Sequence, residues 1–235
     1  MPDSGDPMRR SFLKAGAAAL GSAALHADPQ ATPRPNLIFM TTDGHRPDAL
    51  SLNGNRILQT PNFDRIGREG VQFRNSFVCN ALCLPSRATA LTGLHSHNTG
   101  CVDNMNRAIP TDIPLFTDLL RGAGYEVAVF GKAHVRDLGK RDFDYYFGYP
   151  GAATDYFWPV IMEGAHGKVG PPTVHDGYVE DVVMDRAIGW LKQKRSKPFC
   201  MIFWFQSPHA RRRLEELRRE TDDGYVYQPP PGRGG

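Results

Sequence analysis

The sequence lacks the features that mark several classes of protein. Its four cysteines are too few and too irregularly spaced for a disulfide framework, and no Cys-x-x-Cys pair suggests a zinc site. No stretch reaches the roughly eighteen consecutive apolar residues of a membrane span, so no span is expected. Basic and acidic residues nearly balance, 28 against 25, and no basic stripe carries interleaved aromatics, so no nucleic-acid partner is expected. The 235 residues, 40% of them apolar, instead suit a globular domain with a sizeable buried core.

The first thirty residues have the composition of an export signal. Arg9-Arg10 is followed by Ser-Phe-Leu-Lys, which resembles the twin-arginine signal of exported bacterial proteins. A run of alanine, glycine, serine and leucine follows at residues 15–25 and is too short to span a bilayer. The alternative is an amphipathic helix that stays attached, but so many small residues would pack poorly. We therefore expect residues 1–30 to be a twin-arginine signal and linker, with the twin-arginine export machinery as a partner and a periplasmic or secreted location.

The body of the chain alternates between the patterns of strands and helices. Short apolar runs rich in β-branched and aromatic residues predict strands at 36–42, 71–78, 125–130 and 198–205. Helical spacing of apolar residues, with proline starts and glycine stops, predicts helices at 61–69, 85–92, 111–121 and 176–194. This alternation predicts an α/β fold in which a mainly parallel sheet is sandwiched between helices.

Polar side chains follow three of these strands, where ligands bind in parallel sheets. Asp43 follows the first strand, and its carboxylate is a hard oxygen ligand suited to calcium or magnesium, although a turn aspartate is the plainer interpretation. Lys132 and His134 follow the strand at 125–130 and point the same way if the chain stays extended, so they could hold an oxyanion and move a proton. His209 follows the last strand. Each basic residue could be structural when taken alone, but together the three strand ends favour a site.

A cysteine precedes the helix predicted at 85–92. Amide N–H groups at a helix N-terminus favour negative charge, so Cys83 lies beside a potential anion site, and Arg87 lies about one turn further on. A thiolate nucleophile of low pKa is the generic functional interpretation, and a buried structural cysteine is the alternative.

The residues around this cysteine carry a family resemblance. The segment 83–87 reads Cys-Leu-Pro-Ser-Arg, which matches the Cys-x-Pro-Ser-Arg signature of sulfatases. Other segments resemble sulfatases in the same order: Pro-Asn-Leu-Ile-Phe through the aspartate at 43, Thr-Pro-Asn-Phe-Asp at 60–64, Gly-Tyr through Gly-Lys-Ala-His at 124–134, and Ser-Pro-His at 207–209. The resemblance implies an alkaline-phosphatase-like α/β core, which we place at residues 31–210.

The resemblance also implies a mechanism. In sulfatases the signature cysteine is oxidised by a formylglycine-generating enzyme, so Cys83 is expected to become formylglycine, whose hydrate attacks sulfur. Calcium is the implied cofactor, with Asp43 and residue 83 as ligands. The implied substrate is a small-molecule or carbohydrate sulfate ester. The remaining implied roles fall to four basic residues: Arg87 holds the modified residue, His134 assists its hydroxyl, and Lys132 and His209 grip the sulfate oxygens.

The chain departs from the family pattern in two places. Gly44 stands where many sulfatases have a second acidic or amide side chain. Residues 211–235 form an atypical tail rich in arginine, proline and glycine, in place of the family's later metal ligands. We therefore expect a chain truncated before the C-terminal portion, with under-coordinated calcium and poor activity. The alternatives are a phosphate- or phosphonate-ester hydrolase of the same superfamily and a non-catalytic sulfatase remnant.

Overall fold

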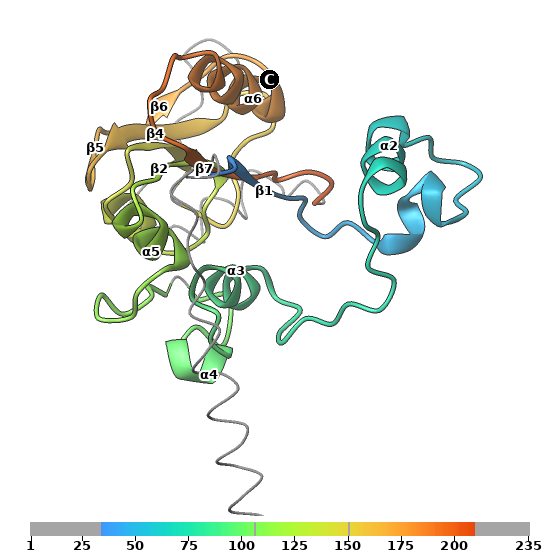
Figure 1. Cartoon of the computed structure of the whole chain (residues 1–235), viewed down its shortest axis with the longest axis horizontal. Helices are drawn as coiled ribbons and strands as arrows, with labels where there is room; N and C mark the ends of the chain where they lie inside the picture. The colour runs from blue at the N-terminus through green and yellow to red at the C-terminus, as the bar shows by residue number, and fades with distance from the viewer. Residues whose placement is uncertain (1–33, 106, 150, 210–235) are drawn as a thin grey trace, which may run out of the picture. The chain divides into compact units, whose positions relative to one another are not determined.

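A computed structural model describes residues 34–105, 107–149 and 151–209 (Figure 1). The strands that it contains form a seven-stranded sheet with the order β1-β7-β2-β3-β4-β5, and β6 pairs with β4. Their bounds are β1 (Leu37–Thr41), β2 (Glu126–Lys132), β3 (Tyr145–Tyr149), β4 (Val160–Ala165), β5 (Lys168–Val169), β6 (Thr173–Val174) and β7 (Phe199–Trp204). The export signal expected at 1–30 and the tail at 211–235 lie outside the described residues.

The half of the sheet that bears the three polar strand ends is parallel. β1 pairs with β7 so that Thr41 lies opposite Trp204, and β7 pairs with β2 so that Phe203 lies opposite Phe130. β2 and β3 are also parallel, whereas the β3–β4, β4–β5 and β4–β6 pairs are antiparallel. The expected α/β sheet is therefore confirmed, and the carboxyl ends of β1, β7 and β2 lie side by side.

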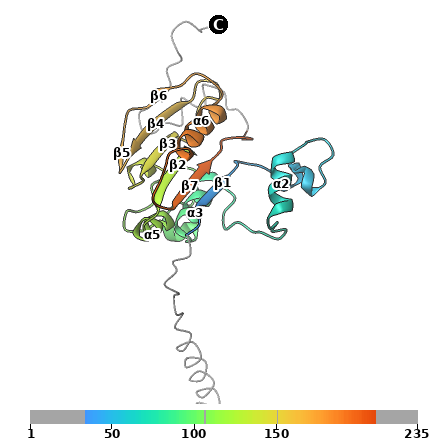
Figure 2. The same cartoon turned by 45° about the horizontal axis from the view of Figure 1, so that its top comes forward.

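Helices cover both faces of this sheet. The α-helices are α2 (Pro61–Glu69), α3 (Cys83–Thr92), α4 (Ser96–Thr99), α5 (Phe116–Gly122) and α6 (Val179–Leu191), and the 3₁₀ turns are η1 (Pro47–Ala49), η2 (Ser51–Asn53) and η3 (Leu138–Lys140). Figures 1 and 2 show α6 on one face, with α3 and α5 on the opposite face. In the part of the chain that the structure describes, no helix is long and apolar enough to cross a membrane.

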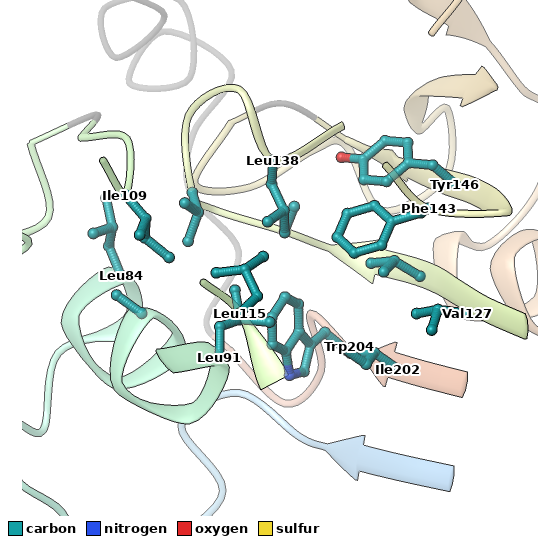
Figure 3. Packing of buried hydrophobic residues seen from close by; sticks show 14 of the residues in the cluster. Leu84, Leu91, Ile109, Leu115, Val127, Leu138, Phe143, Tyr146, Ile202 and Trp204 are labelled. Carbon is teal, nitrogen blue, oxygen red and sulfur yellow. The ribbon is translucent and has the colours of Figure 1, made fainter. Parts of the chain in front are cut away.

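Each face of the sheet has its own hydrophobic cluster. Under α6, Trp190 packs edge-on against Phe130, which stacks on Phe203 of the next strand. On the opposite face, Leu84 and Leu91 of α3 belong to a cluster with buried residues of β2, β3 and β7 (Figure 3). The N-terminal end of α3, which carries Cys83, is thus held to the sheet by apolar packing within the same helix.

Local sequence signals explain where these helices begin and end. α2 starts at Pro61, and α3 stops at Gly93, whose φ of +71° is left-handed. α5 starts at Phe116 rather than at the expected residue 111, because Pro114 restricts the residue before it to an extended conformation. The Leu115 amide, just before the helix, donates to the Asp118 carboxylate at 2.8 Å. α6 likewise begins three residues later than expected.

One expected strand is absent. Residues 71–78 alternate as a strand should, but the structure assigns them no strand and leaves Phe73 80% and Phe77 93% exposed. Alternation is insufficient for a strand, which also needs a partner for its backbone hydrogen bonds. The sequence patterns also did not predict β3, the aromatic stretch at 145–149, or the short strands β4 to β6, which add antiparallel pairs beyond it. β1 forms an edge of the described sheet, and its apolar side chains are substantially exposed.

Gly131, just before Lys132 in β2, is expected to tolerate no side chain. Its φ is +86°, and a Cβ there would lie 2.1 Å from the Trp204 carbonyl oxygen of β7. Gly131→Ala should lower the free energy of unfolding by roughly 2–4 kcal/mol, through a strained φ and a backbone clash. Gly189→Ala is the matched control, because Gly189 in α6 is exposed with open space around it, and alanine is favoured in helices by up to about 1 kcal/mol. Equal stability of both variants in urea unfolding would contradict this expectation.

Candidate active site

The candidate site lies where β1, β7 and β2 end. Asp43 follows β1, Lys132 is the last residue of β2, and His209 lies in the turn after β7. Cys83 is the first residue of α3, on the helix that packs beneath these strand ends. The three strand ends and the signature cysteine, which are far apart in the sequence, therefore supply one site.

A buried cluster of charges forms the centre of this site. The Lys132 ammonium donates a hydrogen bond to Asp43 Oδ2, and an Arg87 Nη atom lies 3.5 Å from the same oxygen. The side chains of all three residues are at most 7% exposed. Burial opposes ionisation of Asp43, but Lys132 and then Arg87 outweigh it and hold the pKa of this carboxyl below its ordinary value of 3.8. Burial lowers the pKa of Lys132 and Arg87, and Asp43 opposes both shifts.

Cys83 points at this cluster. Its Sγ atom lies 3.5 Å from Asp43 Oδ1, to which the thiol donates, and 4.0 Å from the Lys132 Nζ atom. Burial raises the pKa of the thiol, and the neighbouring Asp43 carboxylate adds to this shift while Lys132 opposes it. A thiolate nucleophile requires the opposite shift, so the surroundings of Cys83 do not favour an activated thiolate. The amide of the next residue, Leu84, donates to the Asn104 side chain at 3.0 Å, which uses one of the N–H groups expected to attract an anion.

Arg87 is fixed from two sides. One Nη atom donates to the main-chain oxygen of Lys132 at 2.7 Å, and the guanidinium carbon lies 5.0 Å from the ring centre of Trp204. A guanidinium over an indole face gains cation–π stabilisation. The sequence analysis found Arg87 but missed Trp204, whose position in an apolar strand gave no sign of a role beside charge.

Three side chains could share a metal ion. One ligand atom each from Asp43, Cys83 and His209 lies within 4.8 Å of the other two. Calcium takes six to eight oxygen ligands, and here the Asp43 carboxylate is the one oxygen group among the three. Conversion of Cys83 to a hydroxyl-bearing residue would supply a second. Of the three potential ligands, Asp43 alone suits calcium before Cys83 is converted, so the described residues do not complete a calcium shell.

His134 is buried near this cluster, two residues after Lys132. Its φ of +48° is left-handed, so the chain does not stay extended from Lys132 to His134. The expectation that strand alternation points these two side chains the same way therefore rests on a wrong premise. The assignment of His134 as the group that assists the nucleophile remains a prediction.

The turn that carries His209 is braced by residues that the sequence analysis missed. The Gln206 side chain is 1% exposed and bonds the Thr154 main chain twice, at 2.8 Å and 3.0 Å. The Glu180 carboxylate accepts from two amides of the same turn, and the Tyr156 hydroxyl donates to the His209 carbonyl. In the sequence, Glu180 had the pattern of an ordinary acidic residue in the first turn of a helix.

Comparison with known proteins gives consistent results. A family model described as Sulfatase matches residues 35–229. The N-acetylglucosamine-6-O-sulfatase of Bacteroides thetaiotaomicron is 40% identical over 193 residues, which cover 80% of this chain and 33% of that protein. The ulvan-active sulfatase of Formosa agariphila is 28% identical and is matched over 76% of this chain and 31% of its own length. The chain thus spans about a third of the length of these curated relatives.

Solved structures share the fold. One, described as a complex with its substrate D-glucosamine-2-N,6-O-disulfate, superposes with a TM-score of 0.68 at 40% identity and covers 75% of this chain and 35% of its own. The putative sulfatase YidJ of Bacteroides fragilis superposes with a TM-score of 0.63 at 21% identity, over 84% of this chain and 50% of its own. The second likeness concerns the fold alone.

Proposed function

Because the chain belongs to the sulfatase family, we propose that it supplies the nucleophile and the sulfate-binding side of a sulfuric ester hydrolase. One observation carries this proposal. The signature cysteine, Cys83, lies 3.5 Å from the Asp43 carboxylate and 4.0 Å from the Lys132 ammonium. A nucleophile at residue 83 would have a potential metal ligand on one side and a cation for the sulfate oxygens on the other.

The nucleophile would come from modification of Cys83, and the metal would be calcium held by Asp43 and residue 83, which supplies Lewis acidity. A hydroxyl of the formylglycine hydrate would bond to sulfur as the bond from sulfur to the ester oxygen breaks and the alcohol leaves. Loss of the proton from the second hydroxyl would then re-form the aldehyde and release sulfate. Formation of the nucleophile makes a formylglycine-generating enzyme a partner of this chain.

The chain's own residues would orient and neutralise the ester. Lys132, which is buried and cationic, would bind a sulfate oxygen, together with His209 at the end of β7. Arg87 would hold residue 83 and Asp43 in place through its contacts with Asp43 Oδ2 and the Lys132 carbonyl. His134 would move a proton at the hydroxyl of residue 83.

The substrate that we favour is a sulfated carbohydrate. The relative that is 40% identical is named N-acetylglucosamine-6-O-sulfatase, and a solved structure of the same identity holds a sulfated glucosamine. We place the protein in the periplasm or outside the cell, delivered by the twin-arginine machinery through residues 1–30, with the α/β core at 31–210 and the tail at 211–235.

The test compares three ester classes on one leaving group. The purified chain, supplied with calcium and co-expressed with a formylglycine-generating enzyme, is offered an aryl sulfate, the matching aryl phosphate and the matching phosphonate, with N-acetylglucosamine 6-sulfate as a sugar substrate. Faster sulfate release from the sulfate esters is the expected result. Faster phosphoester cleavage would reassign the reaction. No turnover of any ester, with residue 83 shown by mass spectrometry to be formylglycine, would leave a non-catalytic sulfatase remnant.

A further inference from the structure

The backbone that follows β7 still bonds to the end of β1. The Phe205 amide donates to the Thr41 carbonyl at 2.9 Å. The next two amides, of Gln206 and Ser207, donate instead to one carboxylate oxygen, Glu180 Oε1, at 2.9 Å and 2.7 Å. Hydrogen bonds to an ionised acceptor are among the stronger ones in proteins, so α6 grips this turn through a single side chain.

The turn that Glu180 holds is hydrogen-bonded to Asp43 and contains His209. The Ser207 carbonyl accepts from the Asp43 amide at 3.1 Å, and the His209 amide donates to the Gln206 carbonyl at 3.0 Å. Asp43 and His209 belong to the three-residue group whose ligand atoms lie within 4.8 Å of one another. A shift of the turn away from Glu180 would therefore move both of these residues.

Two further contacts hold this turn, but they involve side chains of the turn and not the two amides that Glu180 binds. Gln206 ties it to the Thr154 main chain, and the Tyr178 hydroxyl lies 2.8 Å from Ser207 Oγ. Since a buried amide without a partner is costly, the carboxylate sets where those two amides can lie.

We propose that Glu180 is a positioning residue, which holds the turn at 206–209 so that Asp43 faces the calcium ion and His209 faces the sulfate group of the substrate. This proposal rests on the proposed function, because it presumes that Asp43 binds calcium and that His209 binds sulfate. It goes beyond that function in assigning the placement of these two residues to a side chain of α6.

The experiment compares three variants of the full chain, each co-expressed with a formylglycine-generating enzyme, by calcium titration calorimetry. Glu180→Ala removes the acceptor and is expected to weaken calcium binding by about 10–100-fold, the usual cost of losing a group that orients a metal ligand. Glu180→Gln keeps an acceptor oxygen and is expected to recover most of the lost affinity. Asp181→Ala is the matched control, because Asp181 is an exposed acidic residue in the same first turn of α6. Its affinity is expected to equal that of the wild type.

Two readouts separate a positioning role from plain structural support. Hydrogen exchange at the amides of Gln206 and Ser207 should quicken by about tenfold or more in Glu180→Ala and stay unchanged in Asp181→Ala. Calcium binding by Glu180→Ala as tight as in the wild type would overturn the proposal. If the wild type binds no calcium, the metal site of the proposed function is wrong, and exchange alone then decides whether Glu180 holds the turn. Unchanged hydrogen exchange at these amides in Glu180→Ala would show that Glu180 does not hold the turn.

Discussion

Replacing Lys132 by methionine is expected to lower the free energy of unfolding by about 3–5 kcal/mol, the usual cost of leaving one partner of a buried ion pair uncompensated. The Lys132 side chain is 1% exposed and bonds Asp43 Oδ2, whose remaining cation, Arg87, lies further away at 3.5 Å. Methionine fills a similar volume, so the loss would come from the stranded carboxylate and not from a cavity. Urea unfolding at neutral pH measures the change.

Two controls test this reasoning. Lys140→Met removes an exposed lysine that pairs with Asp137 at 2.7 Å, and the cost should stay below about 1 kcal/mol, as for other surface pairs. The double variant Asp43→Asn with Lys132→Met removes both charges and should be more stable than Lys132→Met alone, because the stranded carboxylate is gone. A Lys132→Met variant as stable as Lys140→Met would show that the buried pair is not what holds the strand ends together.

The second large effect concerns turnover. If the chain hydrolyses sulfate esters as proposed, Cys83→Ala should reduce kcat by a factor on the order of 10⁴–10⁶, as expected when a nucleophile is removed. Alanine carries no sulfur to oxidise, so no hydrate hydroxyl can form beside Asp43. Initial rates of aryl sulfate hydrolysis measure the loss.

The matched control for this variant is Cys79→Ala. Cys79 is an exposed free cysteine, four residues earlier in the chain, and its replacement should leave both turnover and stability unchanged. Equal loss in both variants would point to a general effect of cysteine replacement. Full activity in Cys83→Ala would exclude residue 83 as the nucleophile and, with it, the proposed mechanism.

The centre of the fold could be predicted because its signals are local. The runs at β2 and β7 are apolar on both faces, as central parallel strands are, and β1 has the same pattern although it lies at an edge of the described sheet. A polar residue stands at or shortly after the end of each run. Because carboxyl ends of parallel strands meet at one edge, Asp43, Lys132 and His209 could be expected in one site from their positions at or after the ends of predicted strands. The structure confirms that placement.

The errors arose where structure depends on partners that a sequence pattern does not name. Residues 71–78 alternate correctly, yet no strand pairs with them in the described part of the chain. The sequence patterns also gave no prediction for β3, which pairs along its length with β2. In both cases the deciding quantity is a set of backbone hydrogen bonds to residues distant in the sequence.

The sequence identified candidate reactive residues of the site but not the residues that hold them in place. Cys83 and Arg87 are carried by a specific five-residue signature. Glu180 and Trp204, in contrast, lie 97 and 117 residues further along the chain than Cys83 and Arg87 respectively, and no local pattern distinguishes them from an ordinary helix acid and an ordinary strand aromatic. Only the tertiary contacts reveal what they hold.

The position of Asp43 in the site depends on the register of β1 against β7. One residue of strand is about 3.3 Å long, which is close to the distance that separates the cysteine sulfur from the Asp43 carboxylate. If β1 slipped by a single residue, its side chains would exchange faces. Such a slip would separate Asp43 from Cys83 while most of the sheet remained. The surroundings of the Cys83 thiol therefore report correct assembly more strictly than secondary structure content does.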